Sequence, residues 1–275
     1  MKGCVGICLI MDKIINTKAE DYLLGLPSEY IDLTVTSPPY DKMRDYNSLF
    51  DLDLIAKQLY RTTKNGGACV WIVGDATIDG GETGTSFKQA LKFIENGWKL
   101  FDTMIYAKPP RGAVGNNKTY WQSFEYMFVF SKGKPRTFNP IMENSICYGM
   151  KHYWGDTKRE TKAAVRTGNK KTPVCRMKIK TNCWEYAVGG ITDNGNHPAV
   201  YPEQLAKDQI ISWSNEGDII FDPFMGSGTT AKMAFVTGRK YIGFEISKEY
   251  CGIANKRLEN VKSQLSLFND LQGAK

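Results

Sequence analysis

The fold of this chain is decided by one glycine-rich stretch, Asp222-Pro223-Phe224-Met225-Gly226-Ser227-Gly228-Thr229-Thr230. An apolar run at residues 218–221 precedes it and predicts a strand, and residues 226–237 predict a helix opened by the glycines. Glycines let the backbone turn sharply and approach a ligand closely, and a helix N-terminus offers free N–H groups. The stretch therefore predicts a ligand-binding turn between a strand and a helix.

Taken alone, this turn fits more than one kind of site. Gly226, Gly228 and Ala231 satisfy a loose dinucleotide-binding pattern. Glu245 ends the next predicted strand, residues 241–245, where an acid can accept hydrogen bonds from ribose hydroxyls. A P-loop does not match, because no Lys-Ser/Thr pair follows the glycines at the required offset. A NAD-type oxidoreductase and a purely structural turn with a solvent-facing Glu245 both remain open here.

A second motif, Thr36-Ser37-Pro38-Pro39-Tyr40, ends the predicted strand at residues 31–36. Its prolines have no N–H donor and force a loop, at the carboxyl edge where open α/β sheets bind ligands. The lone pair of an exocyclic base amine is delocalised into the ring, so the amine is a poor nucleophile. The Ser37 hydroxyl and the Pro38 carbonyl are two acceptors that can hold its hydrogens and favour a pyramidal nitrogen, and Tyr40 offers a stacking face. The alternative is a proline-ended strand with Tyr40 in the core.

Strand and helix patterns alternate along most of the chain. Further strands are predicted at residues 68–73, 98–106 and 125–130, and further helices at residues 52–63, 86–95, 201–212 and 248–267. A short buried strand is also expected at residues 3–11, since this run lacks the cleavage site of a secretory signal. Strands separated by helices predict a parallel sheet covered on both faces.

The alternation breaks in a basic stretch between the two motifs. Residues 134–180 contain twelve Lys and Arg against three acids, interleaved with Tyr148, Tyr153 and Trp154, and show no convincing period. We therefore expect two α/β blocks flanking a basic, irregular insert.

Composition limits the class of protein. A chain of 275 residues with 42% hydrophobic residues can bury the core of one large domain, and its net charge of +7 suits a polyanionic partner. Seven scattered cysteines without a C-x-x-C pair, and two histidines, favour reduced cytoplasmic thiols over disulfides or a metal site. Because no apolar run reaches the ~20 residues of a membrane span, a soluble protein with no membrane partner is expected.

Together the motifs resemble the DNA amino-methyltransferases, which modify N4 of cytosine or N6 of adenine. Their order is that of the circularly permuted group (the beta class), in which a Ser/Asp/Asn-Pro-Pro-Tyr motif precedes the cofactor motif. Residues 70–75, 125–130 and 197–205 resemble further segments of that family, so nearly the whole chain is covered. The resemblance implies an α/β fold of the Rossmann-like S-adenosylmethionine-dependent methyltransferase type. Its sheet is circularly permuted and mostly parallel, with helices on both faces and a basic target-recognition insert.

The resemblance also assigns parts of the chain and residues to roles. Residues 1–138 form the catalytic half, residues 139–196 the target-recognition insert and residues 197–275 the cofactor-binding half. The catalytic loop is Ser37, Pro38, Pro39 and Tyr40. S-adenosyl-L-methionine is the implied cofactor, and the residues implied to bind it are Asp222, Phe224, Gly226, Gly228, Thr229, Thr230 and Glu245.

Within that set, Phe224 is implied to pack near the adenine or methionine part of the cofactor, and Glu245 to hold its ribose. Asp222 is implied to serve the amino end of the cofactor or to order the loop. One departure is that residues 14–18 show no clear match to the acid that often follows the first strand in this family. The contact expected there is left unassigned.

The implied partner is double-stranded DNA, from which the target base is flipped out before a direct in-line methyl transfer. The candidate DNA contacts are Arg159, Arg166, Lys170, Lys171 and Arg176. Each alone is better explained as a solvated surface charge, whereas the cluster is better explained by DNA. Such binding should weaken steeply with salt. The resemblance is also compatible with a homodimer and with a separately encoded restriction endonuclease, in a restriction-modification or epigenetic context.

The target amine is predicted less directly. Ser37 and the segment His197-Pro198-Ala199 favour N4 of cytosine within the family, and N6 of adenine is the alternative. An oxidoreductase would leave Ser37-Pro38-Pro39-Tyr40 and the basic insert unexplained. A methyltransferase acting on RNA or protein would keep the cofactor site, and an inactive binding protein would not need both motifs intact.

Overall fold

The computed structural model describes residues 11–39, 50–109, 120–148, 151–154, 157–158, 165–166, 170–173, 175–187 and 202–273. The chain divides into a larger unit, Met1–Asn139 with Asn182–Lys275, and a smaller unit, Pro140–Thr181. None of the helices in these described ranges combines the length and the apolar composition that crossing a membrane requires.

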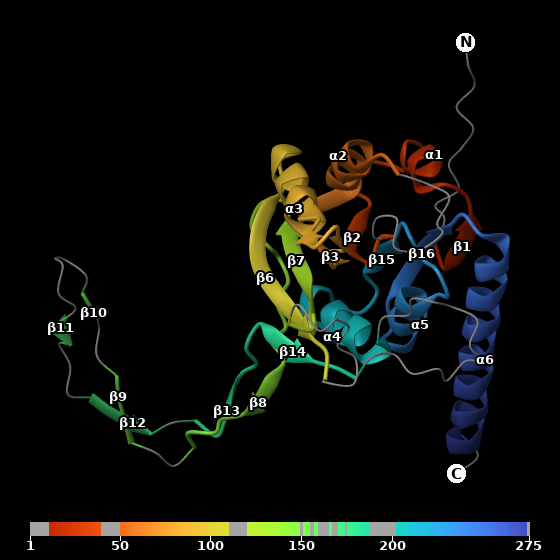
Figure 1. Cartoon of the computed structure of the whole chain (residues 1–275). Helices are drawn as coiled ribbons and strands as arrows, with labels where there is room; N and C mark the ends of the chain where they lie inside the picture. The colour runs from red at the N-terminus through yellow and green to blue at the C-terminus, as the bar shows by residue number, and fades with distance from the viewer. Residues whose placement is uncertain are drawn as a thin grey trace. The chain divides into compact units, whose positions relative to one another are not determined.

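The larger unit is built on an eight-stranded sheet (Figure 1). In spatial order its strands are β1 (Lys13–Asn16), β16 (Lys240–Glu245), β15 (Ile219–Asp222), β2 (Ile31–Thr36), β3 (Thr63–Val73), β7 (Phe124–Ser131), β6 (Lys99–Ala107) and β14 (Cys183–Glu185). Neighbouring strands are parallel except around β7, which runs antiparallel to both β3 and β6. The mostly parallel sheet is therefore confirmed.

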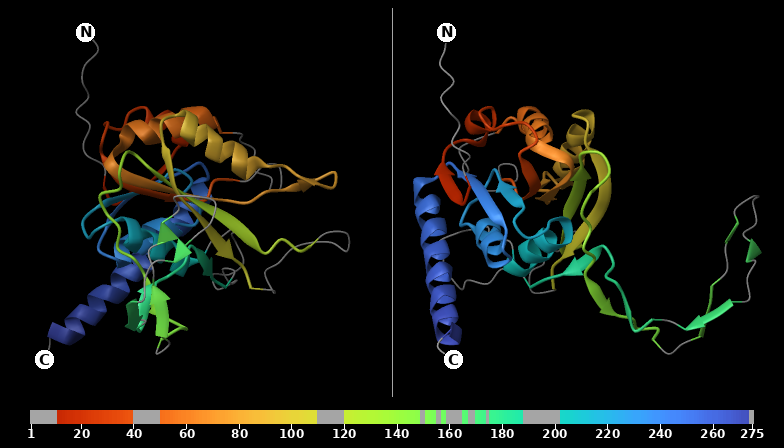
Figure 2. Two further views of the ribbon diagram at one scale, coloured as in Figure 1. Left: turned by 90° about the vertical axis from the view of Figure 1, so that its left-hand side faces the viewer. Right: turned by 180° about the vertical axis from the view of Figure 1, so that it is seen from behind.

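Helices cover both faces of this sheet (Figure 1 and Figure 2). One face carries α1 (Ala19–Leu23), α2 (Leu52–Thr62) and α3 (Thr85–Glu95), and the other carries α4 (Glu203–Trp213) and α5 (Thr229–Val236). The last helix, α6 (Lys248–Gly273), packs beside α5 and β1. A small hairpin of β4 (Thr77–Ile78) and β5 (Gly81–Glu82) precedes α3.

Several element boundaries differ from those predicted, and one strand was not predicted. Helix α5 begins at Thr229 and not at Gly226, because Gly226 and Gly228 have φ of +52° and +86°, which a right-handed helix does not allow. The first described strand is β1, which was not predicted. The strand expected at residues 3–11 lies, apart from Met11, outside the described residues.

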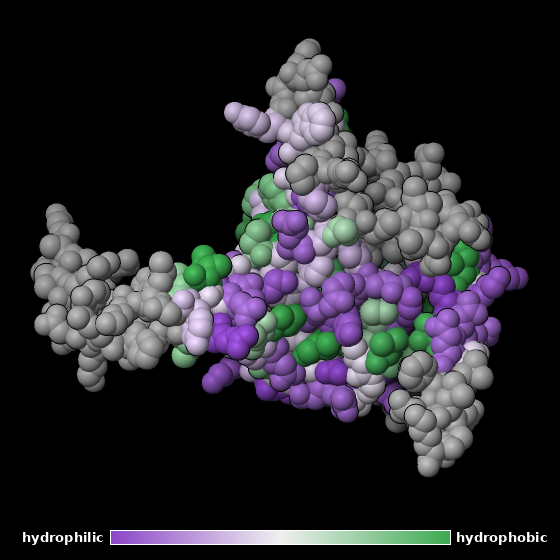
Figure 3. All heavy atoms as spheres, turned by 90° about the horizontal axis from the view of Figure 1, so that it is seen from below, coloured by the Kyte–Doolittle hydropathy of each residue, from purple (hydrophilic) through white to green (hydrophobic). Residues whose placement is uncertain are grey.

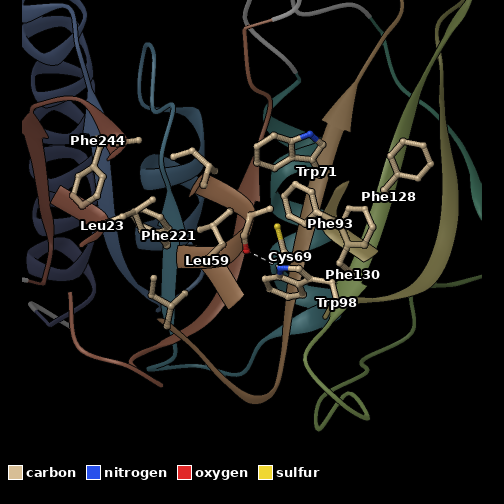
Figure 4. Close-up of a cluster of buried hydrophobic side chains, with 14 of the residues drawn as sticks. Leu23, Leu59, Cys69, Trp71, Phe93, Trp98, Phe128, Phe130, Phe221 and Phe244 are labelled. Carbon is tan, nitrogen blue, oxygen red and sulfur yellow. Dashed lines mark hydrogen bonds between the residues drawn. The ribbon is translucent and has the colours of Figure 1, made fainter. Parts of the chain in front are cut away.

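A hydrophobic core lies between the sheet and helices α1 to α3 (Figure 4). Phe93 of α3 stacks on Phe130 of β7 with ring centroids 4.5 Å apart. Trp98 donates from Nε1 to the Ala56 carbonyl at 3.0 Å, so its one polar group is satisfied inside the core. Each fully buried aromatic contributes about 2–3 kcal/mol. This core holds in place the strands that end in the two motifs.

In its described residues, the smaller unit contains three antiparallel strand pairs. They are β8 (Met142–Asn144) with β13 (Met177–Ile179), β9 (Lys151–Trp154) with β12 (Lys170–Pro173), and β10 (Thr157–Lys158) with β11 (Val165–Arg166). The expectation of an irregular insert was wrong here, because strands this short and polar leave no hydrophobic period to detect. The predicted insert extended to residue 196, whereas β14 pairs with β6 and belongs to the larger unit.

The face seen in Figure 3 is mainly hydrophilic among the described residues. Hydrophobic side chains form small separate groups on it, as is usual for the surface of a globular protein.

Candidate active site

The two predicted motifs meet at one edge of the sheet, because β2 and β15 are parallel neighbours (Figure 1). Their register pairs Leu33 with Ile220 and Thr34 with Phe221, so both strands end together. The Ser37 loop leaves β2 at this carboxyl edge and the glycine-rich loop leaves β15 beside it. This is the edge at which open parallel sheets bind ligands.

Asp222, at the end of β15, connects the two loops. Its Oδ1 accepts hydrogen bonds from Thr36 Oγ1 at 2.6 Å and from the Phe224 backbone N–H at 2.9 Å. Its Oδ2 accepts from Thr230 Oγ1 at 2.6 Å. The side chain is almost wholly buried, with 1% of the residue exposed. Of the two roles implied by the resemblance, these contacts support ordering of the loop.

The electrostatic setting of Asp222 differs from that of an exposed carboxylate. Burial raises the pKa of Asp222 to about 6, and the negative charge of Glu245 acts in the same direction. The hydrogen bonds from Thr230, Thr36 and Phe224 oppose this rise, because they stabilise the charged form. The pKa of Asp222 thus lies well above the usual range of an exposed carboxyl.

The loop requires glycine at position 228 for a steric reason. Gly228 is the N-cap of α5 at φ +86°, and a Cβ there would lie 2.8 Å from the Ala254 Cβ of α6. No other residue fits both the conformation and the space. Next to it, Ser227 is fixed by Arg257, whose Nη1 donates to its carbonyl at 2.7 Å and to its Oγ at 2.8 Å. Sequence reasoning missed Arg257, because it lies 30 residues after Ser227 and no local pattern joins the two.

Glu245 lies at the end of β16 and joins two turns. Its Oε2 accepts from the Gly226 N–H and its Oε1 from the Ser247 N–H, both at 2.8 Å. Asn16, at the end of β1, donates from Nδ2 to the carbonyls of Glu245 and Ile246 at 2.9 and 2.8 Å. Asn16 thus lies at the end of the first described strand, within residues 14–18, where the sequence showed no clear match to the acid of the resembled family. The pair of β-branched residues before it was the available signal for β1.

Phe224 lies against an aromatic cluster beneath the loop. Its ring centroid is 4.8 Å from that of Phe50 and 6.0 Å from that of Trp71. Phe50 precedes the N-cap of α2 and was not predicted to belong to the site. The contact between Phe224 and the cofactor stays a prediction.

The described part of the catalytic loop is Ser37 to Pro39. Pro38 is buried, and Ser37 and Pro39 are half-buried. Thr36, the residue before Ser37, is fully buried and bonded to Asp222, so the loop starts from a fixed point. Tyr40 lies outside the described residues, and its stacking role stays a prediction.

The predicted DNA contacts lie in the smaller unit. Arg166 belongs to β11 and Lys170 and Lys171 to β12, while Arg176 is exposed just ahead of β13. Arg159 lies outside the described residues. Their contact with DNA stays a prediction.

A family model described as DNA methylase, of the N6 and N4 type, matches residues 31–256. This chain belongs to that family. The orphan methyltransferase M.BamHII of Bacillus amyloliquefaciens is 52% identical over 238 residues, which are 84% of this chain and 89% of that protein.

Two solved DNA methyltransferases show the same fold. The cytosine-N4-specific PvuII DNA methyltransferase matches with a TM-score of 0.64 and 21% identity, covering 89% of this chain and 85% of its own. The complex of M1.HpyAVI with SAM matches with a TM-score of 0.57 and 22% identity, covering 90% and 99%. The Rossmann-like fold of S-adenosylmethionine-dependent DNA methyltransferases is therefore confirmed.

The protein is thus a DNA methyltransferase, and its cofactor is S-adenosyl-L-methionine. The residues at the carboxyl edge fit this cofactor. In the described part of the chain, the carboxylates of Asp222 and Glu245 are bonded to hydroxyls and backbone N–H groups. Their negative charge favours a cationic sulfonium nearby. The oxidoreductase alternative is excluded with this assignment.

Proposed function

We propose that this DNA methyltransferase methylates the exocyclic N4 of cytosine in a base flipped out of double-stranded DNA. The observation that carries the proposal is the 2.6 Å hydrogen bond from Thr36 Oγ1 to Asp222 Oδ1. It fixes the start of the Ser37 loop beside the glycine-rich loop. An amine held by the first loop then lies next to a cofactor held by the second, which lowers the entropic part of the barrier.

Ser37 and Pro38 are proposed to prepare the amine for attack. The Ser37 hydroxyl and the Pro38 carbonyl accept its two hydrogens and draw the nitrogen lone pair out of conjugation. Ser37 orients and polarises the amine and does not act as a base, because a hydroxyl of ordinary acidity cannot take a proton before attack. The bound cofactor supplies an electrophilic methyl group for in-line displacement.

The choice of cytosine rests on two sequence features. Ser37 in the catalytic loop and the segment at residues 197–199 resemble the N4-cytosine members of the family. N6 of adenine is the second candidate, because the matching family model includes N6 enzymes. Both targets present the same amino group to the same two acceptors, so geometry alone does not separate them.

Residues 139–196 are proposed to recognise the DNA target. Arg166, Lys170 and Lys171 belong to strands of the smaller unit, and Arg176 is exposed. Lys and Arg are the residue types that contact phosphates and guanine edges. A homodimer, a partner endonuclease and a cytoplasmic location stay predictions.

The test is to express the protein in a host without DNA methylation and to measure N4-methylcytosine and N6-methyladenine in its DNA by nucleoside mass spectrometry. Wild type should raise N4-methylcytosine alone. Ser37→Ala should keep the cofactor affinity and lower turnover by about 100-fold or more, as removal of a transition-state hydrogen bond does.

The control is Ser263→Ala, at an exposed position of α6. It should leave methylation unchanged. Appearance of N6-methyladenine alone would select the second candidate, and full turnover by Ser37→Ala would overturn the role of Ser37.

A further inference from the structure

Three residues tie the catalytic loop to the cofactor loop, and we call them the Asp222 link: Thr36, Asp222 and Thr230. Thr36 ends β2 and Thr230 is the second residue of α5. Both hydroxyls donate to the Asp222 carboxylate at 2.6 Å, one to each oxygen. Thr36 and Thr230 are both fully buried.

The link has a second connection to β2. Thr230 Oγ1 lies 3.1 Å from the carbonyl oxygen of Val35, the residue before Thr36. The first turn of α5 therefore contacts the end of β2 both directly and through the carboxylate.

We propose that the Asp222 link is a positioning device: it holds the Ser37-Pro38 loop at the reaction geometry relative to the glycine-rich loop. Asp222 then acts through two threonines and contributes to turnover without contacting the cofactor. This proposal rests on the proposed function of the same site. It gives Thr36 a role of its own, and it gives Thr230 a positioning role distinct from the cofactor binding that the resemblance implied.

The charge around the link provides a specific readout. Among the described residues, the titratable groups that act on Asp222 or respond to it are Glu245 of β16 and the buried Cys69 thiol of β3. The pKa of Cys69 is raised well above its usual value by burial and by Asp222. Neither supplies positive charge. The threonine hydroxyls stabilise the Asp222 carboxylate, so loss of one should raise the pKa of Asp222 further above about 6.

The chain offers a matched control for Thr36. Thr34 lies on the same strand and is equally buried, and its hydroxyl has no hydrogen-bond partner among the residues that the structure describes. Thr36→Val and Thr34→Val make the same change two residues apart. Only the first removes a bond to Asp222.

The first experiment measures kcat, the cofactor Kd and the pH profile of methyl transfer. Thr36→Val should lower kcat by about tenfold, the equivalent of one buried hydrogen bond, with the cofactor Kd changed by less than about threefold. Its acid limb should move to higher pH. Thr36→Ser should restore both values and Thr34→Val should match wild type. Equal effects of Thr36→Val and Thr34→Val would overturn the proposal.

The second experiment does not need activity. Hydrogen exchange of peptides that contain residues 31–37 is compared between wild type and Thr230→Val, without DNA. Exchange should rise at the end of β2 although the substitution lies in α5. A change confined to α5 would overturn the proposal. If wild type methylates no DNA, the proposed function fails, while this exchange result still decides the link.

Discussion

The two ends of strand β2 hold buried carboxylates in opposite ways. At the amino end, Asp32 accepts from Lys64 Nζ at 2.8 and 2.9 Å, from the Ile219 N–H at 2.9 Å, and from Arg136. At the carboxyl end, Asp222 is bonded to the hydroxyls of Thr36 and Thr230 and to a backbone N–H. Both aspartates are nearly inaccessible, with 3% and 1% exposed.

The difference separates stability from function along one strand. Two cations neutralise the charge of Asp32, so that end is a fixed part of the scaffold. In the described part of the chain, the charge of Asp222 is stabilised by two hydroxyls and a backbone N–H and by no cation, and its pKa is raised to about 6. Buried charge without a cation is costly, and it persists where a ligand or a reaction uses it.

The largest expected effect is at the amino end. Asp32→Ala should lower the free energy of unfolding by about 3 kcal/mol, because it leaves two cations and the Ile219 N–H without their acceptor. Urea unfolding measures this loss. The cofactor Kd of the folded fraction should stay within about twofold, since Asp32 lies at the far edge of the sheet from the site.

An exposed ion pair provides the control for Asp32. Glu95, which pairs with Lys92 at 2.6 Å, has 62% of its side chain exposed. Glu95→Ala should change the free energy of unfolding by less than about 0.5 kcal/mol. A loss of cofactor affinity in Asp32→Ala would contradict the assignment of stability to the amino end of β2 and of function to its carboxyl end.

The next effect depends on pH. The pKa of Asp222 is about 6 in the folded chain, above its value of 3.8 when unperturbed, so the folded state binds more protons between these values. Wild-type stability should therefore fall as pH rises from about 4 to about 7. Asp222→Asn does not titrate, so relative to wild type its free energy of unfolding should improve by about 2 kcal/mol across that window.

Urea unfolding at pH 4.5 and 7.5 measures this change in the free energy of unfolding relative to wild type. Asp32→Asn is the comparison variant at the amino end of β2. It should be destabilised at both pH values, because it weakens contacts with permanent cations. A pH-independent difference between Asp222→Asn and wild type would contradict the setting described for Asp222.

The smallest expected effect concerns Asn16. Asn16→Ala removes two hydrogen bonds to the turn after Glu245 and should cost about 1 kcal/mol of stability and weaken the cofactor by about fivefold. Isothermal titration calorimetry measures the affinity. Asn96→Ala also removes two hydrogen bonds, at the end of α3, and should leave the cofactor Kd unchanged. Equal cofactor binding by both variants would show that Asn16 is only structural.

Much of the sheet was predictable because its strands are strongly patterned. Residues 31–36 are six consecutive buried positions, rich in apolar and β-branched side chains and ended by prolines, and β2 has these bounds. The same holds for the glycine-rich turn, whose glycines are required by left-handed φ values. Glu245 was placed correctly at the end of its strand.

The rest depends on contacts between distant residues. β1 has four residues and becomes a strand through pairing with β16, more than 220 residues away. No local pattern joins Thr36 to Asp222, which are 186 residues apart. The direction of β7 is likewise a property of the assembled sheet, since a strand has the same period-two pattern either way.

The strand order also has a consequence during synthesis. β15 lies between β2 and β16 and leaves the ribosome more than 180 residues after β2. At a synthesis rate of about 5–20 residues per second, one edge of β2 stays unpaired for roughly ten seconds or longer before β15 is made. An open edge of a buried strand is a template for pairing with other chains. We therefore expect the nascent chain to need protection from aggregation until its C-terminal third emerges.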